Sequence, residues 1–190
     1  MSYRHLRITL VLLVLAAASS MAGPKDQWFT MGPNVVPIAP QYMVKGGSEN
    51  GRDLFVCRAF TADGVLPGKT WDGLGGCFIA IGGVETLMTQ YQVLGQPPLV
   101  SNYFTYRWAS RFEMIDNPGL WYVAVQGGFN TGLLYDPDFR ICSSVLWVNG
   151  VYLGTHPGRQ AGKPPNDYCF VTWGGHWYAQ QYYDILLYAN

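Results

Sequence analysis

Short apolar runs separated by turn residues fill most of the chain after residue 23. Residues 54–60 and 77–81 are apolar runs of the length typical of buried strands. Residues 146–148 and 151–153 flank Asn149-Gly150, a dipeptide that accepts the positive φ angles of a type I′ turn, so they predict a β-hairpin. No segment after residue 23 shows a sustained helical period. The pattern therefore predicts an all-β fold.

Seven short landmarks occur twice, in the same order, which indicates an internal repeat. The matching segments are Val44–Gly47 with Val125–Gly128, Phe55–Arg58 with Arg140–Ser143, Asp63-Gly64 with Asn149-Gly150, Leu66–Lys69 with His156–Arg159, Cys77–Ile79 with Cys169–Val171, Gly82-Gly83 with Gly174-Gly175, and Tyr91–Leu94 with Tyr183–Leu186. Trp28 likewise matches Trp108. We expect two unequal copies, residues 27–98 and 104–188, joined near Pro97-Pro98 and sharing one core with pseudo-twofold symmetry. The second copy carries an insertion at Val151–Thr155.

The first residues are typical of a secretory signal, which we place at residues 1–22. Arg4 and Arg7 precede an apolar run from Ile8 to Ala18, and Ser20-Met21-Ala22 puts small residues at the cleavage positions. An uncleaved anchor is the alternative. We expect a secreted, extracellular protein.

Composition excludes several classes of function. The chain has 190 residues, of which 12 are Lys or Arg and 12 are Asp or Glu. It therefore lacks the basic excess that nucleic-acid binding requires. Its hydrophobic fraction of 49% is enough to bury a core. No later run is long enough to cross a bilayer, so we expect no membrane insertion.

The sequence also contains no nucleophile elbow, no H-E-x-x-H and no phosphate loop, so we expect no catalysis and no cofactor. The cysteine spacings fit no zinc site, so we expect no metal.

The first copy resembles the DM9 repeat, also called the DUF3421 family. The segments that carry the resemblance are Gly46–Gly51, Leu54–Phe60, Leu66–Lys69, Gly75–Gly83 and Tyr91–Leu94. The second copy is a degenerate version. The resemblance implies an all-β sugar-recognition module, similar to the mannose-specific lectins of invertebrate immunity.

The resemblance also implies the ligand-binding residues. Those lectins use an acidic residue after the Gly-Gly pair and the lysine of a Pro-Gly-Lys turn, which match Glu49 and Lys69 here. The corresponding residues of the second copy are Asn130 and Arg159. A carboxylate accepts hydrogen bonds from sugar hydroxyls and an ammonium donates to them. The two groups would meet if the Gly46-Gly47 loop folds onto the Pro-Gly-Lys turn; the alternative interpretation is a surface salt bridge.

Four cysteines in an oxidising compartment allow two disulfides in three connectivities. We favour pairing within each copy, Cys57 with Cys77 and Cys142 with Cys169. Pairing between copies, or free thiols, are the alternatives.

The remaining candidates have ordinary interpretations. His156 and His176 are expected to be solvated loop residues; a role in a pH response is the alternative. Trp147, Trp173 and Trp177 are expected to fill the core, and stacking on a sugar is the alternative.

The sequence thus predicts a lectin-like protein that binds mannose-type glycans without catalysis and acts in innate immunity. Weak binding at each site would be strengthened by the two copies or by homodimerisation. The competing hypothesis is a secreted structural or protein-interaction module that has lost sugar binding. Pore formation is disfavoured, because the two copies leave no residues for a separate pore-forming module.

Overall fold

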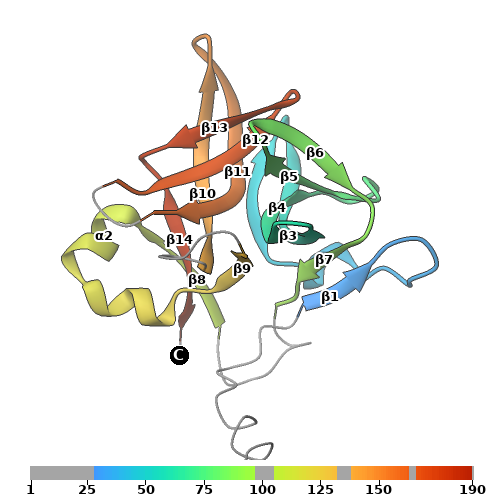
Figure 1. Cartoon of the computed structure of the whole chain (residues 1–190), viewed down its shortest axis with the longest axis horizontal. Helices are drawn as coiled ribbons and strands as arrows, with labels where there is room; N and C mark the ends of the chain where they lie inside the picture. Colours follow the sequence, from blue (N-terminus) through green and yellow to red (C-terminus); the bar gives the residue numbers. More distant parts are fainter. Residues whose placement is uncertain (1–27, 97–104, 132–137, 163–165, 190) are drawn as a thin grey trace, which may run out of the picture.

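A computed structural model describes residues 28–96, 105–131, 138–162 and 166–189, which fold into one 14-stranded antiparallel sheet (Figure 1). The first half contains β1 (Trp28–Met31), η1 (Pro40–Tyr42), β2 (Lys45–Glu49), β3 (Arg52–Thr61), β4 (Gly64–Thr70), β5 (Cys77–Ile81), β6 (Val84–Met88) and β7 (Tyr91–Leu94). The second half contains β8 (Thr105–Ser110), α2 (Arg111–Asp116), η2 (Pro118–Val123), β9 (Gln126–Asn130), β10 (Asp138–Val148), β11 (Val151–Ala161), β12 (Tyr168–Trp173), β13 (His176–Gln180) and β14 (Asp184–Ala189). The predicted all-β class is confirmed. The predicted signal and the Pro97-Pro98 connector lie outside the described residues.

The two halves have matching strand pairings. β3 pairs with β2, β4 and β7, and β10 pairs with β9, β11 and β14. A short strand of each half also pairs with a strand of the other half: β2 pairs with β11, and β9 pairs with β4. The first half, blue to green in Figure 1, and the second, yellow to red, lie side by side in a two-fold arrangement. The domain boundaries 27–98 and 104–188 stay a prediction.

A shared core holds the halves together. Each disulfide lies in a buried cluster of its own half, and the cluster around Cys57–Cys77 also includes Phe139 of the second half. A third cluster contains matched residues from both halves: Val44 and Val125, Val56 and Ile141, Leu94 and Leu186. Because this central cluster needs both halves, burial of its apolar surface favours a single folding unit.

The disulfides join Cys57 to Cys77 and Cys142 to Cys169. Pairing within each half, which the sequence favoured, is therefore what the fold contains. In the part of the chain that the structure describes, no helix is long and apolar enough to cross a membrane.

The turn predicted at Asn149-Gly150 is confirmed, but two other predicted turns are wrong. Asn149 and Gly150 both have positive φ, as predicted. The match with Asn149-Gly150 also predicts a turn at Asp63-Gly64, but the turn residues of the first half are Ala62 and Asp63, while Gly64 already pairs with Thr61 inside β4. Gly64 is needed for a different reason: a Cβ there would lie 2.1 Å from the Phe129 carbonyl oxygen of β9.

The Pro-Gly-Lys segment is the second correction. Pro67, Gly68 and Lys69 are not a turn but lie inside β4, paired in register with Arg58, Cys57 and Val56. The equivalent Pro-Gly-Arg segment likewise lies inside β11. The side chain of Lys69 therefore projects from the middle of a buried strand.

The helix α2 was not predicted. Its N-cap is Ser110, whose side chain accepts a hydrogen bond from the backbone N–H of Glu113. The Ser-x-x-Glu spacing is the local signal for such a start. At six residues, the helix is too short to show a periodic pattern.

Candidate functional site

Lys69 lies at the centre of a polar cluster between the two halves, and only 2% of its side chain is exposed. Its ammonium donates to the carbonyl oxygen of Thr172 at 2.5 Å and lies 3.1 Å from His156 Nδ1. Two carboxylates face the same ammonium, Glu85 at 3.3 Å and Glu49 at 3.6 Å. Four acceptors therefore surround three N–H groups, and the lysine has no donor left over.

Glu49 is the member of the cluster that meets solvent. It ends β2, just before a turn at Asn50-Gly51 in which both residues have positive φ. Its Oε2 faces Lys69 and its Oε1 accepts a 2.8 Å hydrogen bond from the indole N–H of Trp173. The side chain is 19% exposed. The carboxylate is thus held from two sides with acceptor capacity directed outward.

Glu85 is the second carboxylate and is only 8% exposed. Its Oε2 accepts from the backbone N–H of Gly175 at 3.0 Å, and its own N–H donates to the Gly175 carbonyl. Its buried Oε1 has no hydrogen-bond partner among the described residues. The Lys69 charge is therefore what compensates this oxygen.

His156 is fully buried, so its expected place in a solvated loop is wrong; His176 is exposed. Since an ammonium has no lone pair, His156 Nδ1 accepts from Lys69, and Nε2–H donates to the Leu153 carbonyl at 3.3 Å. Burial, reinforced by the Lys69 charge, lowers the pKa of His156 to about 4. The ring is neutral at physiological pH.

This depressed pKa predicts an acid-dependent loss of stability. Between pH 6.5 and about 4 the unfolded chain takes up a proton on His156 that the folded protein does not. The free energy of unfolding should therefore be about 2 kcal/mol lower at pH 5 than at pH 7. Urea unfolding across this range measures the effect. His156→Gln should lose the dependence and His176→Gln should keep it; an unchanged pH profile in His156→Gln would contradict the assignment.

The cluster contains residues of both halves, in contrast to the prediction that one copy supplies the site. Gly46 and Gly47 do not approach their own Pro-Gly-Lys segment. They pack on the other half, where a Cβ on Gly47 would lie 1.9 Å from the Thr155 carbonyl oxygen. This close crossing brings β2 onto β11, so that Glu49 joins His156, Thr172 and Trp173. Glu49 and Lys69 do lie 3.6 Å apart, but not through the predicted contact of the Gly46-Gly47 loop with the Pro-Gly-Lys segment. Their role in ligand binding stays a prediction.

The counterpart pair of the second half has different surroundings. The Arg159 guanidinium lies over the rings of Phe139 and Phe170, at 4.9 and 5.5 Å. Burial lowers its pKa, and its Nε has no hydrogen-bond partner among the described residues. Asn130 ends β9, opposite Gly64. Trp177 stands where the first half has Glu85, so the matching positions contain no carboxylate.

Sequence reasoning missed Glu85, although a signal for it exists. Glu85 follows Gly82-Gly83 at the same spacing at which Glu49 follows Gly46-Gly47. Trp173 packs against the core, as expected, and it also donates to Glu49. The expected core positions of Trp147 and Trp177 are wrong, because both side chains are exposed. Thr172 contributes a backbone carbonyl, for which no residue type gives a signal.

The arrangement can bind a ligand that donates hydrogen bonds. Two carboxylates face one lysine and a neutral histidine, so the cluster keeps one negative charge in excess. Glu49, beside the Trp173 indole, is the more exposed of the two carboxylates. A carboxylate next to an aromatic ring suits hydroxyl-rich ligands with an apolar face. Among the described residues no group of acidic, histidine or cysteine side chains is placed to hold a metal ion.

Residues 48–133 match the family model of the DM9 repeat, so this part of the chain is similar to that repeat. The match includes Glu49, Lys69, Glu85 and Asn130 but not His156 or Arg159.

Comparison with solved structures adds support for the fold alone. The nematode sperm cell motility protein MFP2B is similar with a TM-score of 0.59 and 15% sequence identity, over 88% of this chain. The chain spans only 45% of that protein. No curated protein sequence matches the chain.

Proposed function

We propose that this protein is a secreted, non-catalytic lectin that binds mannose-type glycans at Glu49. The observation that carries the proposal is the partly exposed Glu49 carboxylate, fixed by Trp173 on one oxygen and facing Lys69 with the other. The DM9 repeat, a lectin-like carbohydrate-binding module, supports the same class of ligand. The two disulfides are compatible with an extracellular protein.

In this proposal Glu49 contacts the sugar and Lys69 does not, although the family resemblance assigns both residues to ligand binding. Lys69 is enclosed and its N–H groups are already used, so it orients and neutralises rather than touching the sugar. Vicinal hydroxyls of a mannoside donate to Glu49, and the edge of the Trp173 indole limits where the sugar ring can lie. The second pair, Asn130 and Arg159, is proposed as a weaker polyol-binding position, since both side chains form hydrogen bonds with hydroxyls.

Binding of the mature protein to yeast mannan and to a glycan array tests the proposal. Glu49→Gln keeps the size of the side chain and an oxygen for Trp173, but removes the charge. Charged hydrogen bonds contribute about 1.5–3 kcal/mol, so affinity should fall roughly 10- to 100-fold.

Glu113→Gln is the matched control, because Glu113 is a carboxylate in an exposed ion pair with Arg107 elsewhere in the second half. It should bind like the unmodified protein. Absence of binding to every mannoside would reject the lectin proposal. Equal binding by Glu49→Gln and the control would reject the site while leaving a lectin.

The second candidate function is a structural or protein-interaction module. The observation in its favour is the same enclosure of Lys69, which matches a cluster that holds the two halves together. In that case mannose soaked into crystals would leave Glu49 without a sugar, although the protein is fully folded.

A further inference from the structure

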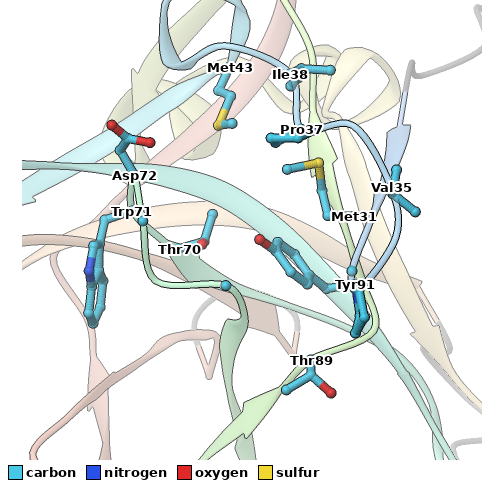
Figure 2. Close-up of a pocket in the computed structure, with 14 residues that line it drawn as sticks. Met31, Val35, Pro37, Ile38, Met43, Thr70, Trp71, Asp72, Thr89 and Tyr91 are labelled. Carbon is cyan, nitrogen blue, oxygen red and sulfur yellow. The ribbon is translucent and has the colours of Figure 1, made fainter.

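A cavity separate from the Glu49 cluster opens in the first half, between the loop after β1 and the segment after β4 (Figure 2). Its volume is about 470 Å³, within the range of small-molecule sites. Apolar side chains form one side: Met31, Val35, Pro37, Ile38 and Met43. Thr70 and Tyr91 supply hydroxyl groups, and Trp71 and Asp72 lie at the segment after β4. The lining includes neither Glu49 nor Lys69.

The two-fold arrangement provides an internal comparison for this cavity. Tyr91 corresponds to Tyr183, and Met31, which pairs with Tyr91, corresponds to Arg111, whose N–H donates to the Tyr183 carbonyl. Gly75 corresponds to Asp167, since each lies two residues before the second cysteine of its half. The cavity thus occupies the place where the second half contains an arginine and an aspartate.

The second half shows what this place can hold. Arg111 donates from Nε and Nη2 to Asp167 Oδ1 at 3.0 and 2.7 Å, and its guanidinium lies 6.0 Å from the centre of the Tyr183 ring. Met114 of α2 is fully buried in the adjoining core. A cation on an apolar stem therefore lies beside the tyrosine, with an aspartate as its counter-ion.

The first half keeps the tyrosine but lacks the built-in cation. Met31 replaces the arginine and Gly75 replaces the aspartate, which leaves space. Asp72 is the only charged residue of the lining, and it forms no ion pair among the described residues. The lining is thus apolar and aromatic with a single negative charge at its edge, and an anion is disfavoured there.

We propose that this cavity binds a small organic cation, a primary ammonium or guanidinium on a short apolar stem. The stem packs against Met31, Ile38 and Met43, and the cation lies toward Asp72 beside the Tyr91 ring. Attraction between a cation and an aromatic ring adds to the charge pairing. Met side chains adapt readily to ligands of different shapes. The cavity therefore discriminates between ligands by their charge rather than by the shape of the stem.

Titration of the full mature protein with 2-phenylethylammonium, followed by NMR chemical shifts, tests the proposal. The neutral isostere 2-phenylethanol and the anion 3-phenylpropionate are the comparison probes. The amine is expected to bind and to shift the Trp71 indole signal, the alcohol to bind several-fold more weakly, and the anion not to bind at 10 mM.

Asp72→Asn should weaken amine binding roughly three- to fivefold and leave alcohol binding unchanged, because an exposed charge contributes up to about that factor. Asp63→Asn, which removes one charge at the opposite end of β4, should change nothing. Equal binding of amine and alcohol, an equal loss in both variants, or no binding of the amine would overturn the proposal. Mannan binding through Glu49 is measured separately, so the two proposals succeed or fail independently.

Discussion

Replacing Asp167 by alanine is expected to lower the free energy of unfolding by about 3–5 kcal/mol, the usual effect of breaking a buried ion pair. Asp167 is 0% exposed and Arg111 is 13% exposed. Asp167 accepts two hydrogen bonds from Arg111 and one from the Tyr183 hydroxyl. Its carboxylate raises the pKa of Arg111, and burial raises that of Tyr183. Without the carboxylate, the partly buried Arg111 guanidinium and the buried Tyr183 hydroxyl lose their acceptor together.

Urea unfolding followed by tryptophan fluorescence measures the effect. The matched control is Asp53→Ala, which breaks the Lys45–Asp53 pair at 2.6 Å, with side chains 56% and 51% exposed. That variant should lose less than about 1 kcal/mol, because water screens exposed charges. Equal losses in the two variants would show that the buried network does not hold α2 and β14 to the core.

Local features of the fold could be predicted from the sequence. The hairpin at Asn149-Gly150 follows from two residues whose own conformational preferences define the turn. Residues 54–60 and 77–81 lie within β3 and β5, because a strand buried on both faces is visible as an apolar run. The within-copy disulfides agreed with the repeat, which placed one pair of cysteines in each copy.

Features that depend on contacts between the halves could not be predicted. Pro67-Gly68-Lys69 has the composition of a turn, yet it is a strand because β3 and β5 pair with it from both sides. The sequence around Gly47 does not indicate that the backbone of β11 lies where a Cβ of residue 47 would be. Because the register between distant strands was unknown, the sequence led to Glu49 and Lys69 but not to His156, Thr172 or Glu85.

The repeated landmarks did not reveal one difference between the copies, the charged pair that only the second copy contains. Matching landmarks suggested equivalent interiors, but Arg111 and Asp167 have no charged counterparts in Met31 and Gly75. Neither residue belongs to a landmark. The shared register with Tyr183 and Tyr91 matches Arg111 with Met31, and the spacing to the second cysteine of each half matches Asp167 with Gly75. Divergence at such unmarked positions places an ion pair beside the tyrosine in one half and a cavity beside it in the other.

Replacing Lys69 by methionine is expected to destabilise the protein by about 3–5 kcal/mol, because two carboxylates then share a buried site without a cation. Methionine has a similar length and packs easily, so the lost charge is the main change. Glu85 suffers most, since its Oε1 has no hydrogen-bond partner among the described residues and faces only the lysine. Lys45→Met, at an exposed lysine, is the control and should lose less than about 1 kcal/mol.

The double variant Lys69→Met/Glu85→Gln separates charge from packing. If the uncompensated Glu85 carboxylate is the source of the loss, the double variant should be about 1–3 kcal/mol more stable than Lys69→Met alone. If the lysine stem matters more than its charge, the second substitution should add a further loss instead. Glu49 is unchanged in the double variant, so its mannan binding also shows whether Lys69 acts by positioning that carboxylate. Unchanged mannan affinity would mean that Trp173 alone fixes Glu49 for the sugar.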